Sequence, residues 1–322
     1  MRKIRWGVIG TADIAQGQTI PGMQLAENCE LYAIAGRSLE KARLFQERFG
    51  FQKAYGSYDE LLSDPEVEAV YIPLPNSLHC EWSIRALKAK KHVLCEKPLA
   101  VSEEQAREMF RAAEENGVLL MEAFAYLHSP FVQAVREELR SGVIGEIRYM
   151  NSSFVAGRRP DTDIRLRRET YGGAMYDLGC YPLSMILRIM EKEPVSVQAV
   201  GQFSDRHIDL FTAALLTFEG GAMADLDCAM LIPGRHDRFV IFGTQGSIVS
   251  GVEFNQPGEI AYTVTRADGA RETKKVFAKN NYCLEVEQLG GCILNGAQPL
   301  VSKEFSLLNA RVMDRILAEI GY

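Results

Sequence analysis

The sequence has no long apolar run and no long basic run. None of its apolar stretches approaches the ~18 residues that a membrane-spanning helix needs. The net charge is −6, and no cluster of lysine and arginine marks a surface for nucleic acid or phospholipid. We therefore expect no nucleic-acid partner and no membrane partner, and small molecules are favoured as ligands.

The cysteines and histidines lack the spacings of common structural sites. The seven cysteines are odd in number, widely spread and without a C-x-x-C pair, which argues against a disulfide framework and against a zinc ribbon. The five histidines form no recognised ligand spacing, so we expect no metal. The first residues enter a strand almost at once, which leaves no room for a signal peptide. These features favour a cytoplasmic location.

Repeats and low-complexity tracts are also absent from the 322 residues. A single hydrophobic core stops growing near ~250 to 300 residues, so this length predicts two domains. From Lys3 to about Met121, short β-rich runs alternate with helical patterns. Because parallel strands need a crossover and a helix supplies it, this part predicts an α/β domain with a doubly wound parallel sheet.

A change of pattern after Met121 predicts the domain boundary. Residues 122–130 are aromatic and end in a helix-starting proline, so we assign residues 1–122 to the first domain and 123–322 to an α+β domain. Alternating runs from Val195 onward predict an antiparallel meander, and therefore a large, open, mainly antiparallel sheet. Subunits often pair through such a face, so we expect a homodimer or homotetramer through the C-terminal sheet.

The first strand, Lys3 to Ile9, is followed by residues 10–15, which read Gly-Thr-Ala-Asp-Ile-Ala, and by a helix to about residue 26. The pattern G-x-A-x-x-A is a weakened form of the G-x-G-x-x-G dinucleotide fingerprint. Gly10 permits the tight turn, Ala12 lets the backbone approach a pyrophosphate, and Ala15 lets the helix pack on the strand. The same letters also fit a small-residue turn in another α/β protein.

Cofactor choice is indicated by the residues after the second strand, which ends at Ala35. NAD enzymes usually place an acidic residue here to hold the ribose hydroxyls, but this chain has Arg37 instead. A guanidinium suits a ribose 2′-phosphate, with Ser38 as an extra donor and Lys41 one helical turn beyond. The pattern favours NADP, and the alternative is that Arg37 is a solvated loop charge.

A predicted strand from Val67 to Ile72 is followed by two prolines, Pro73 and Pro75, which stiffen the loop after it. Asn76 and Ser77 are suited to cap the helix that begins here. His79 opens the same helix, and an isolated histidine is more often a satisfied structural residue than a catalyst. The residues alone therefore leave the role of this loop open.

Residues 95–98 read Cys-Glu-Lys-Pro and close the short strand that begins at His92. A lysine at the carboxyl end of a parallel strand lies at the rim where open α/β sheets bind ligands. Taken alone, Lys97 is more simply interpreted as a surface lysine, the usual place of this residue type. The neighbouring motifs reverse that interpretation.

The glycines at 172 and 173 lead into a predicted helix from about Ala174 to Met190. On it Asp177 and Tyr181 are four residues apart and share one face. The pair suits a substrate-facing role, whereas the structural alternative makes Asp177 a carboxylate favoured by the helix dipole and Tyr181 an interface aromatic.

Residues 157–168 carry five arginines in a segment of poor periodicity. A basic loop of this kind can bind an anionic group, such as the NADP phosphates or an acidic substrate. A solvated loop balanced by Asp161, Asp163 and Glu169 is an equally good interpretation. The sequence assigns no ligand to it.

The motifs at residues 10–15, 75–79, 96–98 and 172–181 together resemble the glucose-fructose oxidoreductase / inositol dehydrogenase (Gfo/Idh/MocA) family, in order over about residues 5–182. Residues 121–124 and Tyr181 are most similar to its branch of dimeric dihydrodiol dehydrogenases and NADP-dependent xylose dehydrogenases. Histidine often stands at the Tyr181 position in inositol dehydrogenases, so the resemblance favours a sugar or a cyclic diol over inositol.

The resemblance implies an N-terminal Rossmann domain that binds NADP, with NAD possible, and Lys97 as the catalytic lysine. It also implies a cis peptide bond between Lys97 and Pro98. The residues that it places against the cofactor lie in the first three motifs and in the loop after the second strand: Gly10, Thr11, Ala12, Asp13, Ile14, Arg37, Ser38, Lys41, Pro75, Asn76, His79, Glu96 and Lys97.

A nicotinamide enzyme must hold the cofactor against a substrate carbinol carbon and must also move the hydroxyl proton, for which a lysine–tyrosine pair is adequate. We therefore expect an oxidoreductase for a secondary or anomeric hydroxyl, or the matching carbonyl, of a sugar, polyol or cyclic diol. Lys97 and Tyr181 would move the proton, with Asp177 holding substrate hydroxyls or orienting the pair. The alternatives are a non-catalytic dinucleotide-sensing regulator, and a reductase of a non-sugar ketone or a linear tetrapyrrole.

Overall fold

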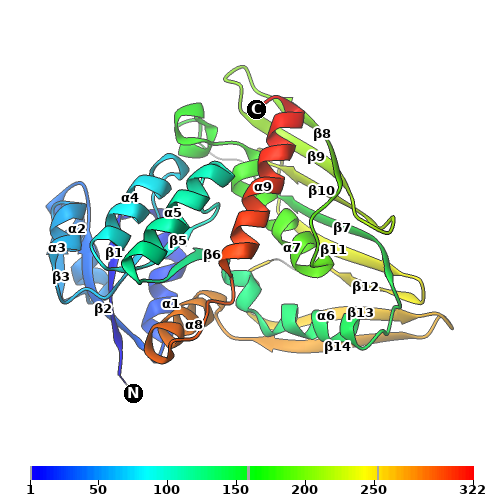
Figure 1. Ribbon diagram of the computed structural model, residues 1–322, viewed down its shortest axis with the longest axis horizontal. Coiled ribbons are helices and arrows are strands. Elements are labelled where there is room, and N and C mark those ends of the chain that lie inside the picture. Colours follow the sequence, from blue (N-terminus) through cyan, green and yellow to red (C-terminus); the bar gives the residue numbers. More distant parts are fainter. Residues whose placement is uncertain (1, 158–159, 252–253) are drawn as a thin grey trace. The chain divides into compact units, whose positions relative to one another are not determined.

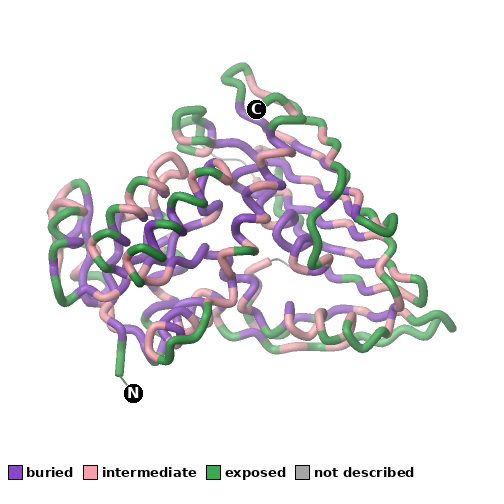
Figure 2. The backbone as a smooth tube through the Cα atoms, in the orientation of Figure 1, coloured by how far each residue is buried: buried purple, intermediate pink, exposed green. Residues whose placement is uncertain are grey.

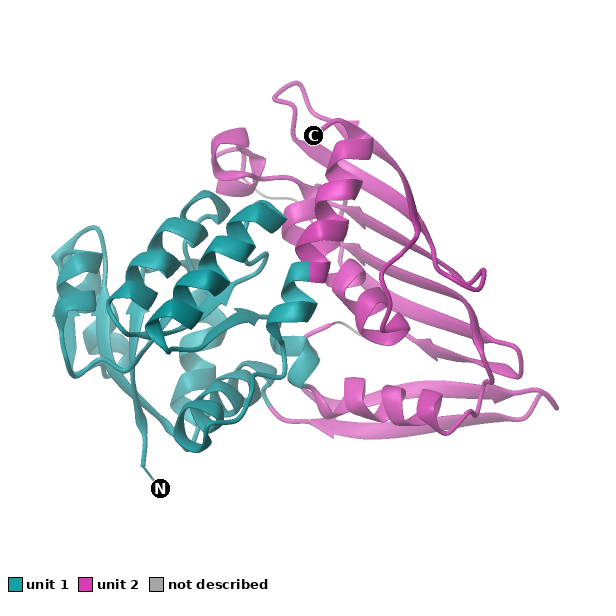
Figure 3. Cartoon of the chain, viewed as in Figure 1, with its two compact units in different colours: residues 1–128, 280–307 teal, residues 129–279, 308–322 magenta. Residues whose placement is uncertain are grey.

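The computed structural model describes residues 2–157, 160–251 and 254–322. The chain forms two compact units, coloured separately in Figure 3. Unit 1 comprises residues 1–128 and 280–307, and unit 2 comprises residues 129–279 and 308–322. The domain boundary between residues 122 and 123 stays a prediction. The two compact units differ from the predicted domains chiefly in that residues 280–307 belong to unit 1.

Unit 1 is built on a six-stranded sheet of order β3-β2-β1-β4-β5-β6, in which all pairs are parallel. This confirms the doubly wound parallel sheet. Strand β3 was not predicted, because it has only three residues and none of them is buried. The strands are β1 (Ile4–Ile9), β2 (Cys29–Ala35), β3 (Lys53–Tyr55), β4 (Ala69–Ile72), β5 (His92–Glu96) and β6 (Leu120–Ala123).

Helices connect these strands, and serine caps begin three of them. The side chains of Ser38, Ser57 and Ser102 each accept a hydrogen bond from a backbone N–H of the first helical turn. Gly117 ends α5 in the left-handed conformation, as its position after the helical pattern predicts. The helical segments of unit 1 are η1 (Ala15–Thr19), α1 (Ile20–Leu25), α2 (Leu39–Phe49), α3 (Tyr58–Ser63), α4 (Asn76–Lys88), α5 (Glu103–Asn116), η2 (Ala125–His128) and α8 (Asn281–Asn295).

Unit 2 contains an eight-stranded sheet of order β14-β13-β12-β11-β7-β10-β9-β8, which confirms a large, mainly antiparallel sheet. Its strands are β7 (Ile147–Val155), β8 (Ser196–Phe203), β9 (Asp209–Thr217), β10 (Met223–Ala229), β11 (His236–Gly243), β12 (Gly246–Ser250), β13 (Gly258–Arg266) and β14 (Arg271–Ala278). Its helical segments are α6 (Pro130–Arg140), η3 (Ile164–Leu166), η4 (Arg168–Thr170), η5 (Met175–Gly179) and α7 (Cys180–Met190), and α9 (Lys303–Ile320) ends in this unit.

The prediction of one continuous meander from Val195 onward was wrong in the middle of the sheet. Strand β7 lies between β10 and β11, paired parallel with β10 and antiparallel with β11. The neighbours β11 and β12 are joined by a tight turn at residues 244–245, whereas β10 and β11 are separated by residues 230–235. The longer connection passes the end of β7, which a hairpin turn cannot do.

The two faces of this sheet differ in what covers them. Helices α6 and α7 lie on one face (Figure 1), and the side chains beneath them, such as Met150, Leu226 and Ile241, are buried. Along the strands buried residues alternate with half-buried and exposed ones, as the colours of Figure 2 show, so the opposite face is less covered. That open face carries the exposed apolar side chains Leu215 and Val249. Among the residues that the structure describes, no helix is long and apolar enough to cross a membrane.

Candidate active site

Strand β1 ends at Ile9, and Gly10 makes the turn that follows it. Gly10 has φ +120°, a conformation that side chains rarely adopt, and a Cβ built on it would lie 3.1 Å from a methyl carbon of Leu74. The Gly10 N–H donates to the carbonyl oxygen of Ala35 at 2.9 Å, which ties the turn to the end of β2. The backbone then becomes helical, with the Gln16 N–H donating to the Ala12 oxygen at 3.1 Å.

The turn at Gly10 lies beside the loop after β2. A Cβ on Gly36 would stand 3.6 Å from the Thr11 methyl carbon, and the Tyr58 hydroxyl lies 3.9 Å from the Cβ position of Gly10. Burial raises the pKa of Tyr58, and the positive charge of Arg37 opposes that rise. The predicted residues Gly10, Thr11 and Arg37 are therefore neighbours, and Tyr58 is a further member that the sequence motifs did not indicate.

The remaining residues of this loop have mixed surroundings. Arg37 and Lys41 are exposed. Ser38 is the N-cap of α2, and its side chain accepts from the Lys41 N–H at 3.5 Å. The Ser38 side-chain oxygen therefore caps helix α2. The hydroxyl group can still donate its hydrogen to a phosphate oxygen.

The loop after β4 is fixed by His79. This side chain is fully buried, with Nδ1 2.9 Å from the Pro98 oxygen and Nε2 2.8 Å from the Leu74 oxygen. Burial lowers the pKa of His79, although both backbone contacts oppose that change. The geometry supports the structural interpretation of His79, because both ring nitrogens face backbone oxygens. It thus fastens the loop after β4 to the turn after β5.

Pro75 and Asn76 begin helix α4. The N-cap position belongs to Pro75, which makes no side-chain capping bond, and Asn76 is the first helical residue. The N-cap therefore lies one residue earlier than the capping Asn76 that the sequence suggests. Asn76 stands at the carboxyl edge of the sheet, where its predicted cofactor contact needs it.

Glu96 and Lys97 follow β5 at the same edge. Glu96 is buried, its Oε1 accepts from the Tyr71 hydroxyl at 2.6 Å, and Tyr71 in turn accepts from the Thr19 hydroxyl at 2.9 Å. The Lys97 N–H lies 3.3 Å from Glu96 Oε2, and the Lys97–Pro98 peptide bond is cis, as the resemblance implies. Glu96 thus supports the turn from the buried side, where it bonds to Tyr71, while the Lys97 side chain is partly exposed on the turn.

In unit 2, Asp177 lies in the π-helical segment η5, just before α7. Its Oδ1 accepts from Arg165 Nε at 3.0 Å, and Arg165 Nη1 lies 3.3 Å from Asp163 Oδ1. Asp177 raises the pKa of Arg165 further above its usual range. Arg165 is a residue that the sequence left without a role, and here it holds the Asp177 carboxylate by a charge-assisted bond.

Tyr181 lies in the first turn of α7 within an aromatic cluster. Its ring centroid is 5.2 Å from Phe154 and 5.4 Å from Phe254, and these two phenylalanines stack on each other at 5.5 Å. Arg235 lies over the Phe154 ring at 4.8 Å and pairs with the buried Asp237 at 3.1 Å. Phe154 and Phe254 carried no sequence signal, because they are 100 residues apart and meet only through the fold.

The arginine-rich loop is partly accounted for by internal contacts. Two of its five arginines, Arg158 and Arg159, lie outside the described residues. Arg165 forms the ion pairs given above, and Arg167 Nη2 donates to the Thr162 oxygen at 3.2 Å. Arg168 stacks over the Tyr322 ring at 3.7 Å. These contacts support the interpretation of a charge-balanced loop for the three described arginines.

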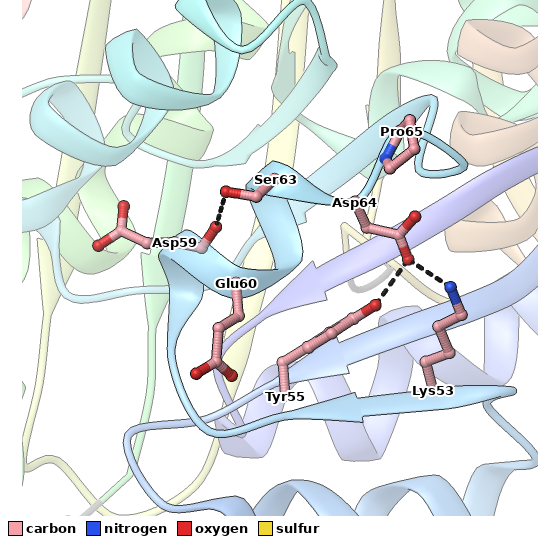
Figure 4. Close-up of a pocket in the computed structure, with 7 residues that line it drawn as sticks. All are labelled: Lys53, Tyr55, Asp59, Glu60, Ser63, Asp64 and Pro65. Atoms are coloured by element: carbon pink, nitrogen blue, oxygen red, sulfur yellow. Dashed lines mark hydrogen bonds and ion pairs between the residues drawn. The ribbon is translucent and has the colours of Figure 1, made fainter.

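A shallow pocket of about 540 Å³ lies elsewhere in unit 1, beside β3 and α3 (Figure 4). Its polar groups bind each other: Asp64 Oδ2 accepts from Lys53 Nζ at 2.8 Å and from the Tyr55 hydroxyl at 2.6 Å. It contains none of the predicted site residues. Over the part of the chain that the structure describes, no group of His, Cys, Asp or Glu side chains could hold a metal ion.

A parallel α/β sheet with a glycine turn after its first strand, followed by a second unit with a large antiparallel sheet, is an architecture found among dinucleotide-binding oxidoreductases. Residues 4–124 match the model of the oxidoreductase family with an NAD-binding Rossmann fold, and residues 132–249 match the GFO/IDH/MocA C-terminal domain. The chain belongs to the Gfo/Idh/MocA family of NAD(P)-dependent oxidoreductases.

Individual relatives cover nearly the whole chain. The crystal structure of KijD10, a 3-ketoreductase from Actinomadura kijaniata in complex with NADP and TDP-benzene, has a TM-score of 0.94, 35% identity and coverage of 99% and 98% of the two chains. A D-xylose 1-dehydrogenase (NADP(+)) from Haloferax volcanii is 34% identical over 98% of both chains. A trans-1,2-dihydrobenzene-1,2-diol dehydrogenase from Xenopus laevis is 30% identical, again over 98% of both.

Proposed function

We propose that this protein is an NADP-dependent dehydrogenase or reductase. It transfers hydride between the nicotinamide and a secondary or anomeric hydroxyl, or the matching carbonyl, of a sugar, polyol or cyclic diol. The observation that carries this proposal is the helix in unit 2 on which Asp177 is held by Arg165 and Tyr181 lies against Phe154 and Phe254. An aromatic surface next to a phenol and a carboxylate suits a ring with an apolar face and several hydroxyls. The named activities of the relatives belong to the same substrate classes.

Unit 1 has the features that a dinucleotide needs. The turn at Gly10 has a positive φ that glycine adopts without strain and leaves the backbone open, and the small residue Ala12 precedes the helical turn that begins at Asp13. We assign the 2′-phosphate to Arg37, with Ser38 and Lys41 as further donors, and the remaining cofactor contacts to Thr11, Asp13, Ile14, Pro75, Asn76 and Lys97. The predicted direct contacts of His79 and Glu96 are not kept, because both side chains are buried and bonded to groups of unit 1 beneath the Lys97 turn. When bound, the cofactor supplies the hydride acceptor or donor.

The chain's own residues supply the proton chemistry. The Tyr181 hydroxyl gives a proton to the substrate oxygen in reduction and takes it back in oxidation, and the Lys97 ammonium polarises the same oxygen. Asp177 accepts hydrogen bonds from substrate hydroxyls. Its ion pair with Arg165 keeps the carboxylate in one orientation, at 3.0 Å from Arg165 Nε.

We further propose a cytoplasmic location and assembly into a homodimer or homotetramer through the open face of the unit 2 sheet. Supporting features of that face are the exposed side chains of Leu215, Phe242 and Val249, at 37%, 45% and 41%. Exposed apolar side chains interspersed with polar groups are common in subunit interfaces. Sedimentation equilibrium measures the assembly, and a monomer at micromolar concentration would contradict it.

The test of the activity is a spectrophotometric screen for reduced nicotinamide. NADP and NAD are each offered with aldoses, ketoses, inositols and cyclic diols, and the reverse direction is offered with the matching carbonyls. We expect turnover with NADP and at least one sugar or cyclic diol. Tight NADP binding without turnover on any substrate would instead favour the dinucleotide-sensing regulator, and turnover only with a non-sugar ketone or tetrapyrrole would favour the third class.

A further inference from the structure

The turn that carries Lys97 is fastened from several sides by buried groups of unit 1. His79 lies against the Pro98 oxygen, and the Cys95 thiol lies 3.9 Å from the Leu99 oxygen. The Leu99 N–H donates to Glu122 Oε1 at 2.9 Å. Glu122 is the register partner of Cys95 on the adjacent strand β6, so the pairing of β5 with β6 places its carboxyl directly beneath the turn.

Glu122 is unusual for a carboxylic acid, because it is only 1% exposed. Burial raises the pKa of Glu122 to about 7, although hydrogen bonding and the positive charge of Lys97 oppose the rise. A residue needed only to bind one backbone N–H could equally be a glutamine, which carries no charge and is cheaper to bury. A glutamic acid at this buried position therefore indicates that the negative charge itself has a function.

The groups around Glu122 identify the partner of that charge. Glu96 and Cys95 of β5 and Lys97 of the following turn interact with it electrostatically, and α9 contributes the hydroxyl of Ser306. Lys97 is the cation among these neighbours. Electrostatic coupling is reciprocal. If the Lys97 charge favours ionised Glu122, then ionised Glu122 favours protonated Lys97 by the same free energy.

We propose that Glu122 is a positioning residue for Lys97: its carboxyl fixes the turn through the Leu99 N–H, and its negative charge keeps the Lys97 amine protonated. The inference rests on the proposed function in one respect, since an ammonium at Lys97 matters for catalysis only if Lys97 polarises the substrate oxygen. The charge coupling itself does not depend on any substrate.

The test titrates Lys97 directly in the full chain without substrate. Lysines are reductively methylated with ¹³C-formaldehyde, and the dimethyl-lysine signal that is missing in Lys97→Met is assigned to Lys97. In Glu122→Gln the amide oxygen still accepts from Leu99 but the charge is gone. We expect the titration midpoint of Lys97 to fall by about one pH unit, the order of magnitude of the coupling between neighbouring opposite charges in a protein. An unchanged midpoint overturns the proposal.

Two further measurements keep the outcome clear. Glu285→Gln is the matched control, because Glu285 is an equally buried acid whose coupling is to Glu96 and not to Lys97; the Lys97 midpoint there should move by less than about 0.3 unit. If Glu122→Gln does not fold, the wild type suffices: its Lys97 signal should show a second, smaller inflection near pH 7, where Glu122 ionises. Absence of that inflection overturns the proposal as well.

Activity provides the link to function. In Glu122→Gln the alkaline limb of kcat should move to lower pH by the same amount as the Lys97 midpoint, and Glu122→Asp, which keeps the charge, should restore it in part. A purely structural Glu122 would lower stability without moving either pH value. If no substrate is turned over, the proposed function fails, but the titration of Lys97 still decides the inference about Glu122.

Discussion

Arg37 is the residue on which cofactor choice depends in the proposed function. It is exposed beside Tyr58 and the Gly10 turn, so its guanidinium is accessible to a ligand. We expect wild-type protein to bind NADP more tightly than NAD and Arg37→Asp to reverse the order. A lost charge-assisted contact amounts to ~1.5 to 3 kcal/mol, or roughly tenfold to a hundredfold in affinity.

Fluorescence titration with each reduced cofactor measures this preference. Arg111→Asp is the control, because it makes the same charge change on the exposed face of α5, away from the loop after β2. Equal affinity of the wild type for both cofactors would remove the assignment of Arg37. A loss of preference in Arg111→Asp would show that net charge, and not the position of Arg37, decides.

The sequence predicts those candidate site residues that belong to short motifs, since each motif has a local physical cause. Gly10 is required by a positive φ, and Lys97 follows the end of a strand. Tyr58 and Arg165 were not predicted as members of the site, because no motif in the adjacent sequence indicates them. Arg165 was one of five similar arginines until the fold placed its Nε against Asp177. Such residues are defined by partners that are distant in the sequence.

At the scale of elements, the helix that carries Asp177 and Tyr181 is anchored at its beginning by Asp209. The Asp209 carboxylate accepts from the Met175 N–H and from the Thr212 hydroxyl, both at 2.8 Å. Gly173 allows this approach, because a Cβ there would stand only 1.9 Å from Asp209 Oδ1. The anchor comes from β9, so the glycine pair seen in the sequence is explained by a strand more than thirty residues away.

Burial raises the pKa of Asp209 to about 6 from 3.8, with the backbone hydrogen bond from Met175 opposing the rise. Because the folded state holds this proton more tightly than the unfolded state does, the contribution of Asp209 to stability falls as pH rises from about 4 to about 6. A difference of about two pKa units corresponds to about 2 to 3 kcal/mol. Asp209→Asn lacks this titration.

Urea unfolding at pH 4 and at pH 7 measures the effect as a difference between variants. On going from pH 4 to pH 7, the wild type should lose about 2 to 3 kcal/mol relative to Asp209→Asn. Asp205→Asn, which changes an exposed carboxylate nearby, should follow the wild type. A wild type and Asp209→Asn that respond alike to pH would show that folding does not shift the pKa of Asp209.

Most elements were predictable because periodicity and punctuation are local. Helix α2 (Leu39–Phe49) begins after the capping Ser38 and ends at Gly50, and both signals are visible in the sequence itself. The partner of a strand is not a local property. The place of β7 between β10 and β11 depends on which strands bury Met150 and Phe154 best, and no turn sequence encodes that choice.

At the scale of the whole molecule, chain order and spatial grouping differ. Helix α8 follows the last strand of unit 2 but packs in unit 1, where a Cβ on Gly22 would lie 2.7 Å from Tyr282 Cβ. Asn28 Nδ2 also donates to the Glu287 oxygen at 2.8 Å. These contacts join segments about 260 residues apart, so a boundary drawn from a change of pattern near residue 122 could not include them.

The two residues of the proposed proton transfer belong to different units, Lys97 to unit 1 and Tyr181 to unit 2. If they act on one substrate oxygen, Lys97→Met should leave NADP binding nearly intact and lower kcat by about 10² or more, a typical loss for general acid–base catalysis. Tyr181→Phe should behave likewise. Lys88→Met, on the exposed face of α4, should keep wild-type turnover.

The double variant decides whether the two residues form one unit. Groups that act together are strongly non-additive, because removing the first already abolishes what the second assists. We therefore expect Lys97→Met with Tyr181→Phe to have a kcat close to that of the slower single variant. The measurement is the turnover number of all four proteins at saturating NADP. Strict additivity would leave both residues important but deny a shared proton path, whereas near wild-type turnover in Lys97→Met would favour the regulator over the enzyme.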